Sequence, residues 1–148
     1  MPIARKKRFA LSGLLVVFLY GASVFIRAEL REREAEDFAS EAMLSFARPW
    51  NATNLEHNSS WWLKEKSNLK PADIVKMAQS DYGNLIDLTA RPSCVLNRGF
   101  DKYSTIEHTY AICELQLKME KREMLIMKIR IIQEDGAWRV NDFMSVNS

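Results

Sequence analysis

The chain has 148 residues, of which 47% are apolar and 27% are charged, and its formal net charge is +2. This length suits one domain with a single core. The charge is uneven: four of the 21 basic residues lie within residues 5–8, so residues 9–148 carry a net charge of −2. A mildly acidic chain beyond residue 8 argues against nucleic-acid binding, because phosphates require a basic surface.

Residues 9–26 form an uncharged apolar run of 18 residues. As a helix this run covers about 27 Å, close to the thickness of a hydrocarbon core. We therefore predict a transmembrane helix over residues 9–27, a cytoplasmic tail over residues 1–8, and an extracytoplasmic domain over residues 28–148. The orientation follows from the basic residues that precede the run, which are expected to stay in the cytoplasm: Arg5, Lys6, Lys7 and Arg8. The expected location is the inner (plasma) membrane, with the C-terminal domain in the periplasm or its equivalent.

A cleaved signal peptide is the alternative to this anchor. Signal peptides have apolar regions of roughly 7–15 residues, followed by small residues at positions −3 and −1 of the cleavage site. Here the apolar run is longer, and cleavage after Ala28 places Ile26 at −3. The sequence therefore favours an uncleaved signal anchor.

The helix is predicted to continue beyond the membrane, because residues 28–47 contain neither Gly nor Pro. Acidic and basic residues between 29 and 41 predict a solvated face. The apolar residues of this segment recur at helical spacing and predict a face that packs on a core: Ala35, Phe38, Ala39, Ala42, Met43 and Phe46. Pro49 is expected to end the helix.

Residues 48–58 predict a loop, and a serine after it can cap a short helix that carries Trp61 and Trp62. Adjacent tryptophans cannot both face the core from one short helix. One is expected to be buried, and the other to line a pocket mouth or an interface. A further helix is predicted to begin at Pro71 and to end at Gly83.

After residue 84 the hydrophobic period changes to two, which predicts an antiparallel sheet of about four strands. Pro92 is expected to interrupt the first strand, and Asp135-Gly136 to form a hairpin turn. The strands are predicted over residues 85–99, 103–119, 123–133 and 138–146. Helices followed by strands predict an α+β domain, with the helices packed on one face of a curved antiparallel sheet.

The two cysteines, Cys94 and Cys113, lie in neighbouring predicted strands of a domain expected to occupy an oxidising space. This placement predicts a disulfide; two buried free thiols are the alternative.

The predicted domain resembles the NTF2-like (cystatin-like) superfamily over residues 28–146. The resemblance is one of pattern, and it is carried by the helix at 35–46, Trp61-Trp62, Tyr82-Gly83-Asn84, Tyr110-Ala-Ile-Cys113 and Glu134-Asp-Gly-Ala-Trp138-Arg-Val140. In that superfamily helices pack in the concavity of a curved sheet. The resemblance implies that Trp138 fills this cone. With one N-terminal span, the architecture also resembles VirB8-type secretion-system proteins.

Type IV pilins and pseudopilins share the order of apolar helix and sheet. They place Gly or Ala before a Phe and a Glu four residues after it. Here Arg8 precedes Phe9 and Gly13 stands where the Glu is expected, which argues against prepilin processing.

The sequence predicts neither an enzyme nor a cofactor or metal site. It contains two histidines, His57 and His108, and their spacing does not match a ligand set. Ketosteroid isomerases of the NTF2-like superfamily place a carboxylate and a hydrogen-bond donor inside the cone. Asp81, Tyr82 and Asp87 lie near that region, but the pair cannot be assigned residue by residue.

The expected function is therefore a membrane-anchored, non-catalytic binding or scaffold domain, an accessory component of a cell-envelope assembly with protein partners. The alternatives are a small-molecule-binding or enzymatic NTF2-like domain and a pilin-like subunit. The oligomeric state is open, with a homo-oligomer included. The candidate pocket or interface residues are Trp61, Trp62, Tyr82 and Trp138.

Overall fold

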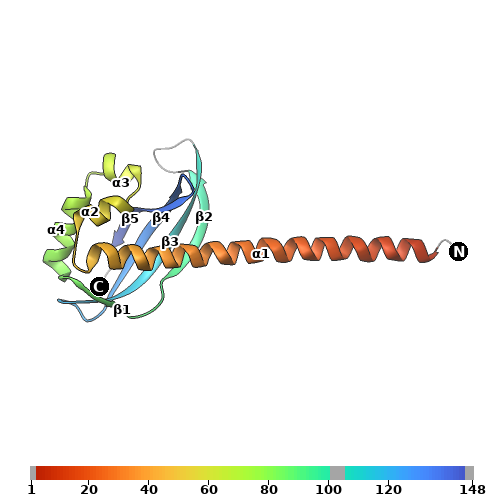
Figure 1. Cartoon of the computed structure of the whole chain (residues 1–148), viewed down its shortest axis with the longest axis horizontal. Helices are drawn as coiled ribbons and strands as arrows, with labels where there is room; N and C mark the ends of the chain where they lie inside the picture. The colour runs from red at the N-terminus through yellow and green to blue at the C-terminus, as the bar shows by residue number, and fades with distance from the viewer. Residues whose placement is uncertain (1–2, 101–105, 146–148) are drawn as a thin grey trace. The chain divides into compact units, whose positions relative to one another are not determined.

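The computed structural model describes residues 3–100 and 106–145. Within them the chain is α+β, as predicted: helices come first and an open antiparallel sheet of five strands follows (Figure 1). The helices are α1 (Ile3–Ala47), α2 (Ala52–Asn58), α3 (Trp61–Glu65) and α4 (Pro71–Tyr82). The strands are β1 (Leu85–Leu88), β2 (Ser93–Phe100), β3 (Glu107–Met119), β4 (Leu125–Glu134) and β5 (Ala137–Ser145).

The chain divides into two compact units between Arg31 and Glu32. In the first unit, α1 is long and apolar enough to cross a membrane, and large apolar side chains such as Leu14 and Phe18 are exposed. The predicted continuation of this helix is confirmed, because α1 ends only at Ala47. The side chains of the predicted orientation signal lie outside the described part of the structure: Arg5, Lys6, Lys7 and Arg8.

The second unit contains the sheet, in which β3 is central. β4 pairs with one side of β3 and with β5, while β1 and β2 both pair with β3. β1 pairs with residues 117–119 and β2 with residues 107–114, so the two strands together form one interrupted edge. The single strand predicted over 85–99 is therefore two strands. Pro92 lies in the interruption, where its missing N–H costs no ladder hydrogen bond.

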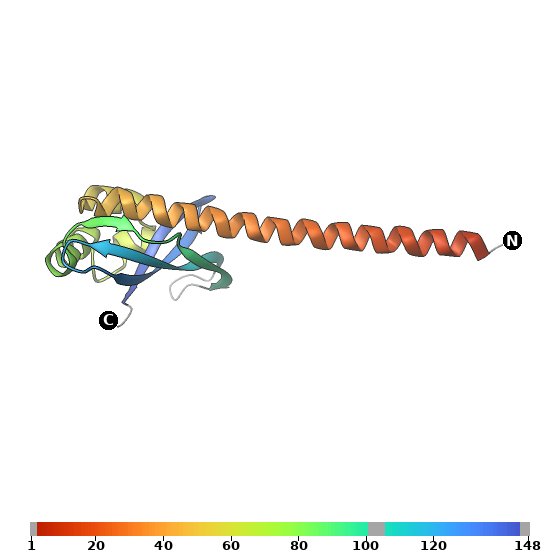
Figure 2. The ribbon, with the colours of Figure 1, turned by 90° about the horizontal axis from the view of Figure 1, so that it is seen from below.

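The C-terminal part of α1 and the three shorter helices cover one face of the sheet (Figures 1 and 2). Phe46 of α1 meets Phe143 of β5 edge to face, with ring centroids 6.0 Å apart. The predicted inward face of α1 is confirmed by buried side chains, with Phe38 partly buried against the core: Ala35, Ala39, Ala42, Met43 and Phe46. On β3 every second side chain is buried: Ala111, Cys113, Leu115, Leu117 and Met119. Residues 103–105 and 146, at the ends of two predicted strands, lie outside the described residues.

The loop predicted over residues 48–58 is wrong, because α2 occupies most of it. Asparagine is typical of loops, but here two asparagine side chains make hydrogen bonds that cap α2 and connect it to α1. The Asn51 side chain caps α2 by accepting from the N–H of Asn54 at 3.0 Å, and the Asn54 amide donates to the Ser45 carbonyl at 2.8 Å. Leu55 is fully buried, so even this short helix contributes to the core.

The helix and turn signals in the rest of the domain are confirmed. Ser60 caps α3, and its hydroxyl accepts from the N–H of Leu63. α4 begins at Pro71 and is capped by Gly83, whose φ of 70° is in the left-handed region. The β4–β5 turn also uses left-handed backbone, with Asp135 at φ 51° and Gly136 at 79°.

Cys94 and Cys113 form the predicted disulfide, directly opposite each other on β2 and β3.

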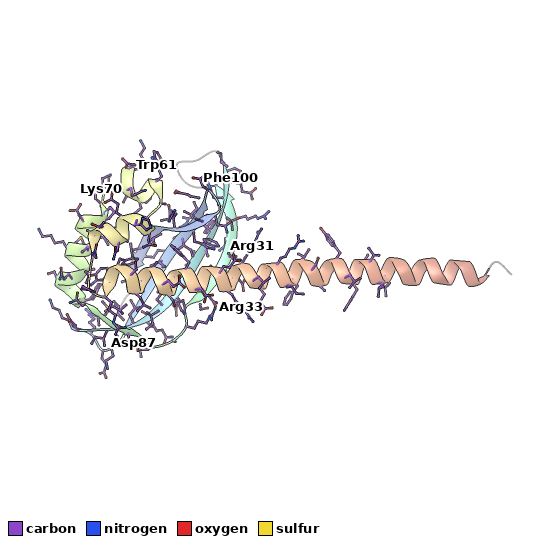
Figure 3. All side chains as sticks on the ribbon, viewed as in Figure 1. Arg31, Arg33, Trp61, Lys70, Asp87 and Phe100 are labelled. Atoms are coloured by element: carbon purple, nitrogen blue, oxygen red, sulfur yellow. A yellow bond between two sulfur atoms is a disulfide. The ribbon has the colours of Figure 1, made fainter. Side chains whose placement is uncertain are left out.

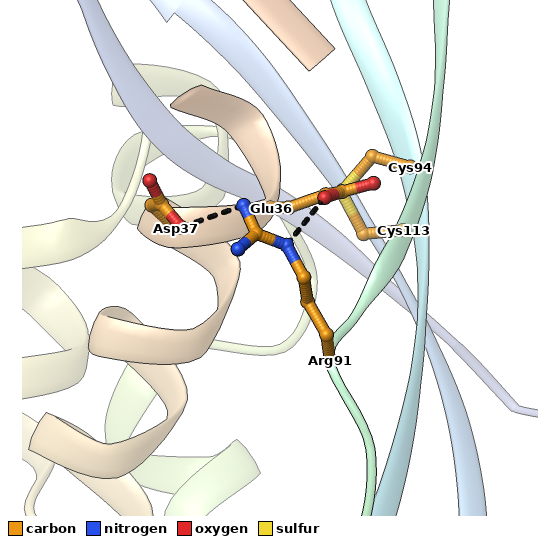
Figure 4. A network of polar contacts seen from close by, with 5 residues as sticks. All are labelled: Glu36, Asp37, Arg91, Cys94 and Cys113. Atoms are coloured by element: carbon orange, nitrogen blue, oxygen red, sulfur yellow. Dashed lines mark hydrogen bonds and ion pairs between the residues drawn. A yellow bond between two sulfur atoms is a disulfide. The ribbon is translucent and has the colours of Figure 1, made fainter. Parts of the chain in front are cut away.

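Beside the disulfide, Arg91 reaches α1 from the connection between β1 and β2 (Figure 4). Its Nε lies 2.7 Å from Glu36 Oε2, and its second terminal nitrogen lies 2.9 Å from Asp37 Oδ1. The hydrogen bond to Glu36, and then the charge of Asp37, raise the pKa of Arg91. Two acidic residues of the α1 segment that was predicted to be a solvated face therefore bind the connection between β1 and β2 at the edge of the sheet.

Candidate binding groove

An apolar groove of about 290 Å³ lies between α4 and the adjoining ends of β4 and β5. One wall is a face of α4 that carries Ile74, Met77, Ala78 and Asp81, at the i, i+3, i+4, i+7 spacing of one helix side. The opposite wall consists of consecutive residues of β4 and β5: Leu125, Ile126 and Met127, and Asp142, Phe143 and Met144. These two strand ends are paired, so their residues form one continuous wall.

The floor of the groove is formed by side chains of the hydrophobic core. Trp50 and Leu63 line it and are both buried. The indole N–H of Trp50 donates to the Gly83 carbonyl at 2.7 Å, and its backbone N–H donates to the Asn84 side chain at 3.3 Å. The floor is thus fixed by hydrogen bonds to the segment that ends α4.

The rim of the groove consists of apolar side chains that water reaches. Leu69, Met77 and Met144 are 47%, 52% and 39% exposed. These three exposed side chains surround one apolar depression and are not scattered singly over the surface. Methionine supplies a flexible, polarizable contact that adapts to different occupants.

The charged residues in the described lining of the groove are both acidic. Asp81 lies at the end of α4, on the helix face that lines the groove. Asp142 lies on β5, where its carboxylate accepts from the Phe143 N–H at 2.8 Å and its partner across the ladder is Arg130. Both residues are exposed. The groove therefore combines an apolar interior with one exposed carboxylate, that of Asp81, on its α4 wall.

The C-terminal end of α4 is held tightly next to this groove. The Glu120 carboxylate accepts from the Asn84 N–H at 2.8 Å, and the backbone N–H of Lys121 donates to the Tyr82 carbonyl at 3.0 Å. Tyr82 lines the groove, and the guanidinium of Arg122 lies 5.7 Å from the centre of its ring. The connection between β3 and β4 thus fixes the position of the α4 wall.

A second, wider hollow of about 620 Å³ is lined mainly by polar side chains of α2, α3 and the β4–β5 hairpin. Glu134 accepts from the Trp61 N–H with both carboxylate oxygens, at 3.0 and 3.1 Å. Arg139 donates to the carbonyl of His57 at 3.4 Å. These bonds hold α2 and α3 against the β4–β5 hairpin.

The four predicted pocket residues are dispersed. Tyr82 lines the groove, and Trp61 lines the polar hollow, where it is 55% exposed and projects from α3 toward solvent (Figure 3). Trp62 is half-buried and packs against the core, so the adjacent tryptophans point in different directions as expected. Trp138 is buried in the core. Trp62 and Trp138 line neither hollow.

The residues considered for catalysis are not brought together at the groove. Asp81 and Tyr82 line it, whereas Asp87 lies on β1 and is absent from its lining. His57 is on α2 and His108 on β3. Among the described residues, no group of three His, Cys, Asp or Glu side chains is arranged to hold a metal ion.

Sequence reasoning missed the residues that form most of the groove. One signal was readable: Ile74, Met77, Ala78 and Asp81 are spaced as one helix face, adjoining the core face of Val75 and Ala78. The other wall gave no local signal. Phe143 and Met144 reach the groove through strand pairing and helix packing that only the folded chain establishes.

Comparison of the chain with protein-family models, curated proteins and solved structures finds no match.

Proposed function

We propose that this chain is a single-pass membrane protein with a cytoplasmic N-terminus, whose extracytoplasmic domain binds another protein as an accessory or scaffold subunit of a cell-envelope assembly. We assign that domain to the NTF2-like class of α+β folds. The assignment is supported by helices that cover one face of an open antiparallel sheet, in the order helices then strands.

The observation that carries the binding role is the apolar groove with its exposed rim at Leu69, Met77 and Met144. Leaving these side chains in water is unfavourable, and a partner that covers them recovers roughly 25 cal/mol per Å² of apolar surface. Buried core residues beneath the groove, Trp50 and Leu63, give it a fixed base.

A small-molecule ligand is the second candidate, because Tyr82 and Asp81 of α4 adjoin the apolar interior. The size of the groove weighs against it. Pockets that enclose drug-sized ligands measure about 300–1,000 Å³. A groove of about 290 Å³ is at the lower limit and open to solvent, which suits one or two side chains of a protein partner.

Site-specific photo-crosslinking in intact cells tests the binding role. A benzoylphenylalanine at Met77 faces the groove, whereas the same group at Gln79 is two residues further along α4 and points to another side of the helix. We expect a discrete crosslinked protein from position 77 and none from position 79. Equal crosslinking at both positions, or none at 77, contradicts the proposal.

A charge substitution gives a second, independent readout. Met77→Arg places a cation over the apolar floor and is expected to remove a co-purified partner, while Gln79→Arg retains it. Both residues are exposed, so neither change is expected to unfold the domain. Retention of the partner by Met77→Arg excludes this groove as its binding site.

A further inference from the structure

The two edges of the sheet differ: β5 is partly covered, whereas β2 is open. Along β5, the connection between α2 and α3 lies in the strand-pairing position, since the Ser60 N–H donates to the Val140 carbonyl at 2.8 Å and Ser59 bridges to Val140. The pairing of β4 with β5 is also irregular between Arg130 and Ile131, which bends the strand. Within the described residues β2 pairs with β3 alone, at the other side of the sheet (Figure 1).

The β2 strand lacks most of the features that protect natural edge strands. Such strands are short or carry lysine, proline or a bulge, because an open row of backbone groups can pair with another strand. All 8 residues of β2 pair with β3 in unbroken register, and none is lysine or proline. Its one charged residue is Arg98, while Val95 and Phe100 are 61% and 69% exposed. β2 is therefore open to pairing with a further strand.

The backbone groups that β2 turns outward follow from its pairing with β3. The Gln116 carbonyl of β3 accepts from the Thr89 N–H at 2.9 Å, so even-numbered residues of β3 direct their backbone groups toward the side of β1 and β2. Cys113 is odd-numbered, and its Cα lies 4.0 Å from that of Cys94, as in a pair that exchanges no hydrogen bonds. The N–H and C=O of Cys94 therefore point away from β3. The same holds for every second residue that follows on β2: Leu96, Arg98 and Phe100.

We propose that β2 pairs antiparallel with β2 of a second copy of this chain, with the twofold axis at Asn97, so that two five-stranded sheets become continuous. In this register Cys94 lies opposite Phe100 of the second copy, and Leu96 lies opposite Arg98. Each of these pairs exchanges two hydrogen bonds, so about eight bonds join the copies and use every outward backbone group of residues 94–100. Because each copy contributes the same edge, the assembly closes as a dimer.

Neighbouring registers leave charges or backbone groups unmatched. An axis at Arg98 places the two Arg98 side chains directly opposite each other, which is repulsive. An axis at residue 95 or 96 brings outward backbone groups opposite Pro92, which has no N–H to donate. An axis at Asn97 avoids both faults. The strand is thus complementary to its own antiparallel copy, and this self-complementarity favours a second copy over a strand of another protein.

Side chains on the face of the sheet away from the helices fit the same register. A Cβ added to Gly99 would lie 3.4 Å from the Tyr110 ring, so this ring lies against Gly99 from the neighbouring strand. An axis at Asn97 places Val95 of the second copy opposite Gly99. The exposed Val95 side chain then meets the Tyr110 ring, above a residue that has no side chain of its own. Aromatic and β-branched side chains form favourable pairs across antiparallel strands.

Cysteine crosslinking of the full chain in phospholipid vesicles tests both the dimer and its register. Asn97→Cys places two thiols across the axis, where the Cα atoms are about 4.5 Å apart and within reach of a disulfide. Val95→Cys is the matched control: Val95 is more exposed and on the same strand face, but its two copies lie about 13 Å apart along the strands. On mild oxidation we expect at least about tenfold more disulfide-linked dimer from Asn97→Cys than from Val95→Cys.

A charge exchange at the axis gives a second readout without added thiols. Asn97→Asp and Asn97→Lys each place like charges opposite each other, whereas a mixture of the two variants pairs opposite charges. Differently tagged copies are reconstituted together, and their copurification is measured. We expect about threefold to tenfold more copurification from the mixture than from either variant alone.

Equal amounts of dimer from Asn97→Cys and Val95→Cys, or no dimer from Asn97→Cys, overturn the proposal. Copurification that is no higher from the mixture than from the single variants overturns the axis at Asn97. The proposed function fails separately, because no β2 residue lines the groove and Met77 lies on α4. Loss of the crosslink at Met77 with an intact dimer at Asn97 contradicts the groove alone, and the reverse result contradicts the dimer alone.

Discussion

Gly83 joins the floor of the groove to its α4 wall. Its carbonyl accepts from the Trp50 indole, and its backbone lies against Glu120 on the β3–β4 connection. A Cβ at this position would lie 2.8 Å from the Cβ of Glu120, and the φ of 70° is one that side chains with a Cβ rarely adopt. Glycine is therefore required here for two separate reasons, backbone conformation and close approach.

Gly83→Ala is expected to destabilise the domain by about 2–4 kcal/mol, which combines left-handed backbone strain with overpacking. Gly136→Ala is the control, because Gly136 has a φ of 79° but nothing lies within 4 Å of its added Cβ. The control is expected to cost about 1–2 kcal/mol. The extra loss in Gly83→Ala, measured as a melting temperature on the full chain, reports the contact with Glu120 together with the ψ of −166° at Gly83. Equal losses in the two variants contradict this account.

The ion pairs of Arg91 with Glu36 and Asp37 connect the edge of the sheet to α1, and their contribution to stability can be measured. Arg91→Ala is expected to lower the melting temperature slightly at low salt, and the loss is expected to vanish at 1 M salt, where the Debye length is about 3 Å. Bonding to Glu36 and Asp37 raises the pKa of Arg91, so its stabilisation is complete below the unfolded-state pKa and is lost only as pH rises through the folded value. Arg91 therefore stays charged at neutral pH, and the stability lost in Arg91→Ala should not change with pH in that range. A deficit that persists at high salt contradicts this account.

At the scale of elements, the periodic segments were predicted well and the groove was not. The apolar face over residues 35–46 and the alternation in β3 each encode burial within one segment, so both could be read directly. The helix α2 was missed because Asn51 and Asn54 have low helix propensity, and their capping bonds depend on where Ser45 lies. The groove was missed because it combines α4 with β4 and β5, which lie far along the chain and reach the groove only through folding.

The disulfide between β2 and β3 bears on the compartment of the domain, because disulfides form and persist in oxidising spaces. It closes a loop between residues 19 apart, which is expected to stabilise by about 3 kcal/mol, or roughly 10 °C in melting temperature. Reductant should therefore lower the melting temperature of the native chain by this amount.

A double Cys94→Ala and Cys113→Ala variant provides the control and is expected to melt lower and to ignore reductant. Alanine is used because both positions are buried. An unchanged melting temperature on reduction, with free thiols detected by alkylation, contradicts the prediction. Alkylation of cells before lysis then reports whether the domain faces an oxidising space.

For the whole molecule, orientation in the membrane decides whether the groove meets an envelope partner at all. The tail before the apolar run carries four basic residues, and the flank after it carries three: Arg27, Arg31 and Arg33. Acidic residues near a span contribute little to orientation. The bias toward a cytoplasmic N-terminus is therefore small, and it depends on the cluster at residues 5–8.

A reporter enzyme that is active only outside the cytoplasm, fused after Ser148 through a flexible linker, measures this orientation. We expect activity in the native chain, because the basic residues of the tail outnumber those of the opposite flank. Replacing residues 5–8 with glutamine leaves three basic residues on the far flank alone and is expected to give a mixed or inverted orientation. Replacing Arg27, Arg31 and Arg33 with glutamine is expected to preserve or increase activity. A native fusion that is active only with a cytoplasmic reporter contradicts the proposed topology, and full activity without the basic cluster contradicts its cause.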